Sequence, residues 1–183
     1  MKDNQDRFDS LICFYADEIG VPFALAKSQA VQESGMNPKA RSAVGAVGLF
    51  QLMPRTDQEV DGKLNAEFIE ENIHDGLTYL REQFDHLSEI PNICERWKFA
   101  LAAYNGGRGY VNAALKLARA SEDLPGDFHK WLQAGSPKGQ WQYWDHTFKF
   151  LAAVKLHGKK PDYEQMIGYV DHIVKNMFTP NVI

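Results

Sequence analysis

Apolar side chains recur along most of the chain with the spacing of one face of an α-helix. Near the N-terminus, Phe8, Ile12, Ala16 and Ile19 share such a face, and Gly20 is suited to end the helix. Asp3 or Asn4 can cap its start. Similar stripes predict helices over residues 8–19, 22–34, 66–84, 97–105, 110–120, 141–156 and 163–178.

Residues 36–54 interrupt this pattern. They contain glycines, prolines and small side chains without a helical period, so we expect a structured loop there. A short β-hairpin within residues 41–52 is compatible with the pattern but is not required by it. No other stretch alternates apolar and polar residues as a half-buried strand does. The sequence therefore predicts a mainly α fold with little or no β-sheet.

The composition is that of a globular protein and argues against some classes of function. The 183 residues are 44% hydrophobic and 24% charged, and the formal net charge is −4. Because nucleic-acid-binding surfaces are normally basic, we expect no nucleic-acid partner. No apolar run approaches the roughly 20 residues of a membrane-spanning helix. The first 20 residues are too acidic and too interrupted for a signal peptide. We expect a monomer.

The residues that most often hold metals or form disulfides give no sign of either role. Cys13 and Cys94 lie among apolar residues at helical spacing, so we expect both to be buried free thiols. The six histidines do not have the spacing of a known ligand set. We therefore expect neither a metal nor an organic cofactor.

Glu33 breaks a local rule of helix design. It lies at the C-terminal end of the predicted helix 22–34, where the helix dipole disfavours a negative charge. Ala30 and Ala26, three and seven residues before it, give its helix face an apolar character. Both features disfavour the ionised carboxyl and predict a raised pKa. A carboxyl that stays protonated near neutral pH is suited to act as a general acid.

Two further segments have the composition of a ligand cleft. The loop from Ser34 to Pro54 combines glycines with apolar residues and with the hydrogen-bonding side chains of Ser42 and Gln51. Apolar walls with a few polar groups are typical of binding clefts, although a loop that simply packs on the core is equally compatible. Tyr104-Asn105 ends a predicted helix and can present a phenol and an amide to a cleft, or can cap the helix.

These three segments together resemble the catalytic domain of the Slt-type (soluble) lytic transglycosylases. The first block comprises Glu33, Ser34, Asn37, Pro38, Ala40, Ser42, Gly45, Ala46, Gly48, Leu49, Gln51, Met53 and Pro54. The second comprises Ala100, Ala102, Ala103, Tyr104, Asn105 and Gly107, and an intervening helix matches at Asn72, Ile73, Gly76, Tyr79 and Leu80. The resemblance covers roughly residues 20–120, and its motifs are dense and specific.

The resemblance implies a lysozyme-like fold of the α+β lysozyme superfamily, in which Glu33 is the single catalytic acid/base. It also implies that the substrate is bound by Ser42, Gln51, Met53, Tyr104 and Asn105. The closing pattern of the family is not recognisable after residue 120. We therefore expect the transglycosylase domain over residues 1–160, and over residues 161–183 a C-terminal helix that is either its diverged end or a small addition.

The activity implied is cleavage of the β-1,4 bond between N-acetylmuramic acid (MurNAc) and N-acetylglucosamine (GlcNAc) in peptidoglycan. Glu33 would protonate the glycosidic oxygen and then deprotonate the C6 hydroxyl of the same MurNAc, which closes a 1,6-anhydro ring. Such an enzyme degrades cell wall and needs no second carboxylate, whereas ordinary glycosidases use two. Asp57 and Glu59 follow the loop among polar neighbours, and we expect both to be solvated.

Two alternatives remain open at this point. A goose-type muramidase has the same fold and glutamate but delivers water, and a non-catalytic structural protein of a virion or secretion apparatus keeps the fold as a scaffold. The substrate lies at the cell wall, in the periplasm or outside the cell. Without a recognisable signal peptide, we expect delivery by a phage particle, a holin lesion or a secretion system, and favour a phage or prophage origin of this bacteriolytic glycosidase.

Overall fold

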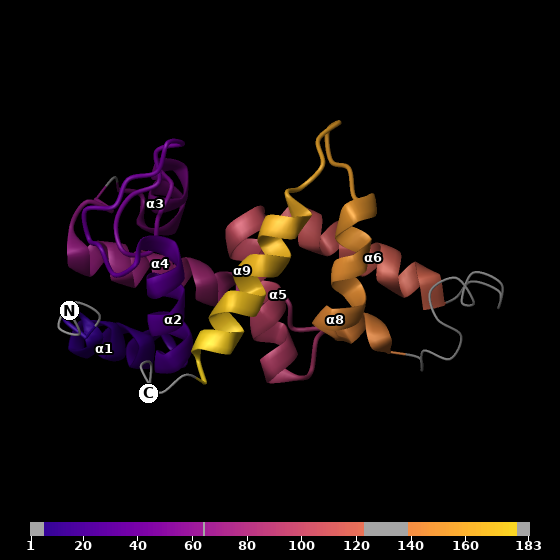
Figure 1. Cartoon of the computed structure of the whole chain (residues 1–183), viewed down its shortest axis with the longest axis horizontal. Helices are drawn as coiled ribbons and strands as arrows, with labels where there is room; N and C mark the ends of the chain where they lie inside the picture. The colour runs from indigo at the N-terminus through magenta and orange to yellow at the C-terminus, as the bar shows by residue number, and fades with distance from the viewer. Residues whose placement is uncertain (1–5, 64, 123–138, 179–183) are drawn as a thin grey trace. The chain divides into compact units, whose positions relative to one another are not determined.

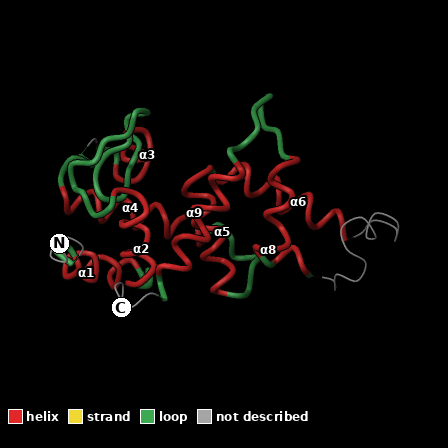
Figure 2. Tube along the Cα trace, in the orientation of Figure 1, coloured by secondary structure: helices red, strands yellow, loops and turns green. Residues whose placement is uncertain are grey.

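The computed structural model describes residues 6–63, 65–122 and 139–178 (Figure 1). Across these residues helices are joined by loops, and the only β-type pairing consists of isolated bridges (Figure 2). The predicted mainly α fold is confirmed. None of the described helices is both long and apolar enough to cross a bilayer.

The chain divides into two compact units. The first contains Met1–Glu82 together with Asp171–Ile183, and the second contains Gln83–Val170. Two helices, α4 (Ile69–Asp85) and α9 (Tyr163–Asn176), contribute residues to both units. The expected division of the chain near residue 160 stays a prediction.

The first unit begins with two helices packed against each other, α1 (Asp9–Ile19) and α2 (Phe23–Ser34). The predicted end of α1 is confirmed, since Gly20 adopts a left-handed backbone with φ of 78°. A left-handed residue is easiest for glycine because it has no Cβ. The expected caps at Asp3 and Asn4 lie outside the described residues.

Lys27 of α2 pairs with Asp6, before α1, and with Asp9, the first residue of α1. Its ammonium group is almost completely buried and lies 2.8 Å from an Asp6 oxygen and 2.7 Å from an Asp9 oxygen. Burial alone would lower the pKa of Lys27, but the hydrogen bonds and charges of both carboxylates outweigh it and raise the pKa. The buried cation is therefore compensated by two anions, as burial of a charge requires.

The loop after α2 is ordered, as predicted. Two antiparallel bridges, Arg41 with Val47 and Val47 with Leu52, fold residues 41–52 into a compact double turn. The loop leads into α3 (Pro54–Asp61), a helix that the hydrophobic pattern does not predict. Its sequence, PRTDQEVD, has hardly any apolar side chains, so there is no stripe to recognise. The helix α4 then follows.

The second unit is built around two longer helices, α5 (Ile93–Gly106) and α6 (Arg108–Glu122). Asn92 caps α5, since its side-chain oxygen accepts hydrogen bonds from the backbone N–H groups of Cys94 and Glu95. Phe99 and Trp144 are both buried and contact each other edge to face, with ring centroids 5.3 Å apart.

The expected long helix over residues 141–156 is wrong. The chain instead forms a succession of short turns, namely η1 (Gln140–Gln142), α8 (Trp144–Thr147) and η2 (Phe148–Ala153). Trp144, Thr147 and Leu151 are buried at helical spacing, which explains the prediction. The extended backbone of Tyr143 separates η1 from α8, and the Thr147 hydroxyl donates to the Trp141 carbonyl across this break, at 2.8 Å.

The prediction that both cysteines are buried is also wrong, because Cys13 and Cys94 are exposed. Cys13 follows the buried Ile12 directly and so points about 100° away from the buried side of α1. Cys94 lies in the first turn of α5, where the neighbouring Ile93 is exposed as well. The core side of α5 begins only at Trp97.

Candidate active site

Glu33 is the last residue but one of α2. The helix ends at Gly35, whose left-handed backbone (φ 60°) donates to the Val31 carbonyl at 2.9 Å. The last turn of α2 contains no basic residue. The carboxyl group is thus attached where the helix dipole is negative, without a cation from its own helix turn to compensate it.

The face of α2 that precedes Glu33 is fully buried. Ala26 and Ala30 have no exposed surface, whereas Glu33 itself is half-buried. The Ser34 hydroxyl donates to the Ala30 carbonyl, four residues before it on the same helix, at 3.1 Å. The side chain of Glu33 therefore leaves α2 at the border between core and surface. The raised pKa expected for its carboxyl stays a prediction.

Ser42 closes the first turn of the loop. Its hydroxyl oxygen accepts a hydrogen bond from the Ala46 N–H at 2.9 Å, and its own N–H donates to the Ala46 carbonyl, also at 2.9 Å. Gly45 allows this turn with a φ of 95°. Because the hydroxyl is used as an acceptor, its own hydrogen remains available to donate to a ligand.

Gln51 shapes the second turn. It has a left-handed backbone (φ 47°), which is uncommon for a residue with a side chain and is maintained only by its surroundings. The amide nitrogen of Gln51 donates to the carbonyls of Ala40 (3.2 Å) and Gly48 (3.0 Å). Both amide hydrogens are thereby used inside the loop, and the amide oxygen remains available as a hydrogen-bond acceptor.

The position of Met53 fits a contact with a ligand. It is the residue before α3, its backbone is extended, and 39% of its surface is exposed. Exposed large apolar side chains occur singly on many proteins. Met53 is of interest because it follows Gln51 and Leu52 at the end of the same loop.

The side chain of Asn72 on α4 holds the loop by hydrogen bonds, a role that the sequence pattern does not reveal. Its side chain is 1% exposed and fully hydrogen-bonded. The oxygen accepts from the Phe50 N–H at 2.9 Å, and the amide nitrogen donates to the carbonyls of Val47 and Ala66, each at 3.0 Å. One side chain of α4 thus joins both turns of the loop to the segment before α4.

Two glycines make this arrangement sterically feasible. A Cβ atom on Gly48 would lie 2.3 Å from the Asn72 amide nitrogen, and one on Gly76 would lie 2.5 Å from the Phe50 Cβ. Real Cβ atoms do not approach so closely, so both positions exclude larger residues. The missing Cβ of Gly48 makes room for Asn72, and that of Gly76 makes room for Phe50.

The expectation that Asp57 is solvated is wrong, although that for Glu59 is confirmed. Asp57 is 2% exposed, and one carboxylate oxygen accepts from the backbone N–H groups of Asn65 (2.8 Å) and Ala66 (3.2 Å). These bonds offset part of the cost of burial, because the other oxygen of Asp57 has no hydrogen-bond partner among the described residues. Glu59 is exposed and pairs with Arg55 on α3 at 2.8 Å. The partners of Asp57 lie eight and nine residues away, which local composition cannot indicate.

Asp75 is a second buried acid of the first unit. One of its oxygens lies 2.7 Å from Nδ1 of His74, and its side chain is 2% exposed. Burial raises the pKa of Asp75, with smaller increases from the charges of Asp61 and Asp57, and His74 partly counteracts them. The second oxygen has no hydrogen-bond partner among the described residues. No three His, Cys, Asp or Glu side chains in the described part of the chain could hold a metal ion.

Tyr104 and Asn105 belong to the second unit, in the last turn of α5. Both are half-buried. Met166 occupies the space beside Gly106, where a Cβ would lie 2.3 Å from its sulfur atom, and Gly107 ends the helix with a φ of 99°. Because these residues and Glu33 belong to different units, their shared contribution to one cleft stays a prediction.

The fold and this arrangement define a lysozyme-like domain with a glutamate at a helix end. A crystal structure of an inactive glutamate-to-glutamine mutant of the lytic transglycosylase Slt from Pseudomonas aeruginosa has a similar fold, with a TM-score of 0.52 and 24% sequence identity. The similarity covers 90% of this chain and 25% of that one. The lysozyme-like, mainly α fold expected from the resemblance is confirmed.

Residues 10–125 match the family model described as the transglycosylase SLT domain. This is more than half of the chain, and the protein therefore belongs to the transglycosylase SLT domain family. The resemblance found in the sequence is thereby confirmed.

Curated relatives are similar over part of the chain. The membrane-bound lytic murein transglycosylase F of Shewanella oneidensis is 44% identical over 95 residues, which are 51% of this chain and 20% of that protein. The protein of the same name from Desulfosudis oleivorans is 35% identical over 113 residues, which are 62% of this chain and 25% of the relative. The chain thus spans about a fifth to a quarter of the length of these relatives.

Proposed function

We propose that the protein is a lytic transglycosylase that cleaves the MurNAc–GlcNAc β-1,4 bond of peptidoglycan glycan strands. Glu33 donates a proton to the glycosidic oxygen as the bond to MurNAc C1 breaks. The resulting carboxylate then accepts the proton of the MurNAc C6 hydroxyl, whose oxygen bonds to C1. The products are a GlcNAc end and a 1,6-anhydro-MurNAc end, and no water is consumed.

The observation that carries this proposal is the placement of Glu33. Its carboxyl leaves the negative end of α2 at the edge of a buried alanine stripe, in a family whose relatives are named as transglycosylases. Such a setting favours the protonated acid that the first step requires. Ser42, Gln51, Met53, Tyr104 and Asn105 are proposed to hold the sugars.

A single acid is sufficient for this chemistry because the attacking hydroxyl belongs to the substrate. Well-oriented intramolecular reactions reach effective concentrations of roughly 10⁵–10⁸ M, which favours ring closure over attack by water. Asp57 does not offer a second carboxylate, since it is buried and hydrogen-bonded to the backbone. This supports the single-acid mechanism over the two-carboxylate one.

The test is the substitution Glu33→Gln, which preserves size but cannot donate and recover the proton. We expect the rate of peptidoglycan cleavage to fall at least about hundredfold, as is typical for loss of a general acid. Glu59→Gln is the matched control, because Glu59 is exposed on α3 and should tolerate the same change. Turbidity loss of purified sacculi gives the rate.

Mass spectrometry of the products separates the alternatives. Anhydro-muropeptides support the transglycosylase, whereas reducing MurNAc ends would assign the protein to the muramidases that deliver water. A parent protein that releases neither product would favour a structural role in a virion or secretion apparatus. The expected site of action at the cell wall, the phage or prophage origin and the monomeric state remain part of this proposal.

A further inference from the structure

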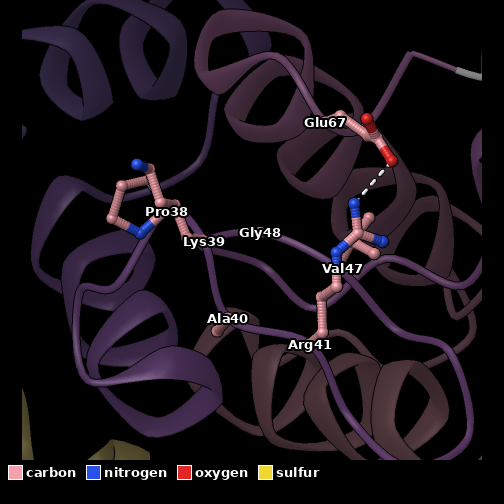
Figure 3. A pocket seen from close by; sticks show the side chains of 7 residues that line it. All are labelled: Pro38, Lys39, Ala40, Arg41, Val47, Gly48 and Glu67. Atoms are coloured by element: carbon pink, nitrogen blue, oxygen red, sulfur yellow. Dashed lines mark hydrogen bonds and ion pairs between the residues drawn. The ribbon is translucent and has the colours of Figure 1, made fainter.

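A pocket of about 270 Å³ opens on the loop that contains Ser42 (Figure 3). Its lining comprises Pro38, Lys39, Ala40, Arg41, Val47, Gly48 and Glu67. In Figure 3, Arg41 and Glu67 lie on one side of the pocket, and Pro38 with Lys39 lies on the other. All of these residues belong to the first compact unit.

Two hydrogen bonds hold the backbone at the floor of this pocket. The Gly48 N–H donates to the Ala40 carbonyl at 3.0 Å, and the Val47 carbonyl accepts from the buried amide of Asn72, also at 3.0 Å. The rim, in contrast, consists of exposed charged side chains. A preformed floor with an adjustable charged rim is suited to bind a small charged group.

The charges of the rim do not balance. Arg41 and Glu67 form an ion pair of 2.6 Å, in which the two side chains are 63% and 68% exposed. Lys39 forms no ion pair with any described residue. Together, Lys39, Arg41 and Glu67 carry one net positive charge. An exposed ion pair contributes little to stability, and the Arg41 guanidinium can exchange Glu67 for another carboxylate at small cost.

We infer that this pocket binds a carboxylate of the short peptide attached to the MurNAc residues of the substrate. The inference rests on the proposed function. Sugar rings are uncharged, so the cationic rim has no partner on them, whereas the peptide carries free carboxylates. Arg41 directly precedes Ser42, for which a sugar contact is proposed. The pocket is smaller than the roughly 300–1,000 Å³ of sites that enclose whole small ligands, which suits the end of a side branch.

The experiment compares two substrates cleaved by the same variants. One is solubilised glycan strands with their peptides, and the other is the same strands after an amidase has removed the peptides. The variants are the pair Lys39→Gln/Arg41→Gln, which removes the positive charges, and Glu67→Gln, which removes the negative one. Arg55→Gln is the control, since Arg55 is 89% exposed on α3 and lies outside the pocket lining. The value of kcat/KM is measured at low salt, where charge effects are least screened.

We expect the double variant to lose about fivefold in kcat/KM on peptide-bearing strands, the upper range for an exposed charge interaction. Glu67→Gln should gain about twofold on the same substrate, because it releases Arg41. On peptide-free strands both variants should match the parent, which also shows that they fold.

Several outcomes would overturn the inference. The first is an equal change of kcat/KM on both substrates, and the second is a loss confined to the peptide-free strands, which carry the uncovered lactyl carboxylate. The third is a lower kcat/KM for Glu67→Gln on peptide-bearing strands. The fourth is that the variants do not differ from the control Arg55→Gln. A parent that cleaves neither substrate refutes the proposed function, and the assignment of the pocket falls with it. A parent that cleaves both equally well, with unaffected variants, refutes the pocket alone.

Discussion

At the scale of single residues, the two acids Glu33 and Asp57 differ in what the sequence can reveal. Glu33 can be located because Gly35 marks the helix end and Ala26 and Ala30 mark the apolar face, all within seven residues of Glu33. Asp57 is buried by contacts with Asn65 and Ala66, which depend on how α3 and α4 meet. Polar neighbours in the sequence therefore do not show that an acid is solvated, because backbone N–H groups can bind its carboxylate in the protein interior.

Asn72 gives the sharpest test at this scale. The substitution Asn72→Asp keeps the shape but removes both amide hydrogens, so the carbonyls of Val47 and Ala66 would face a buried carboxylate. We expect a loss of about 3 kcal/mol or more in the free energy of unfolding, since two donors are lost and a charge is buried. Urea denaturation measures it.

The exposed Asn112 on α6 provides the control for Asn72. Asn112→Asp introduces the same charge at the surface and should change the free energy of unfolding by less than about 0.5 kcal/mol. If the two variants are equally stable, the three hydrogen bonds of Asn72 do not hold the loop.

At the scale of elements, the predictability of a helix depends on how much apolar surface it buries. The helix α9 buries a regular apolar stripe, and α2 is buried over the continuous run from Leu25 to Ala30. The bounds of both helices agree closely with the predicted ranges. The short helix α3 is missed because it is held by Pro54 at its start, Gly62 at its end and the buried Asp57, not by an apolar face. Residues 141–156 show the opposite error, because a helical stripe of buried residues does not require a continuous helix.

Two glycines of the loop 36–53 are needed for different reasons. Gly48 and Gly45 both have a left-handed backbone (φ 80° and 95°), but only Gly48 also has the Asn72 amide where a Cβ would lie. Gly48→Ala should therefore destabilise the protein by about 2 kcal/mol or more, and Gly45→Ala by only about 1 kcal/mol.

Thermal unfolding of Gly45→Ala and Gly48→Ala measures the contribution of the close contact, because the backbone strain is common to both. The larger loss for Gly48→Ala should be accompanied by a larger loss of peptidoglycan cleavage, since Gln51 hydrogen-bonds to the Gly48 carbonyl. Equal destabilisation by the two substitutions would show that Asn72 can move aside.

At the scale of the whole molecule, the sequence predicts the fold class and the family but not the division into two units. The units separate within α4 and α9, whose hydrophobic stripes continue across the boundary without a break. A boundary inside a helix leaves no Pro-, Gly- or Ser-rich linker to recognise. The spacing of apolar and polar residues along the chain thus identifies the helices, but it does not show which helices share a core.

Asp75 should make the stability of the fold depend on pH. Burial raises its pKa above the ordinary value of 3.8, so the folded protein binds this proton more tightly than the unfolded chain does. Its contribution to stability is complete below pH 3.8 and is lost as the pH rises through the folded-state pKa. Asp75→Asn should therefore gain stability relative to the parent as the pH is raised from 4 to 7.

Melting temperatures over this pH range test the effect. Asp17→Asn, on the exposed side of α1, changes the same atoms at the surface and should follow the parent at every pH. A constant difference between parent and Asp75→Asn would show that the carboxyl of Asp75 has no part in the pH dependence.

The Lys27 ion pairs have a practical consequence for anyone who shortens this protein. A truncation that begins after Asp9 would strand a buried ammonium group on α2 without either of its counterions, six residues before Glu33. Breaking a buried ion pair on one side typically costs about 3–5 kcal/mol. An expression fragment intended to retain activity should therefore start before Asp6, and any fusion partner should be joined through a spacer that leaves both aspartates in place.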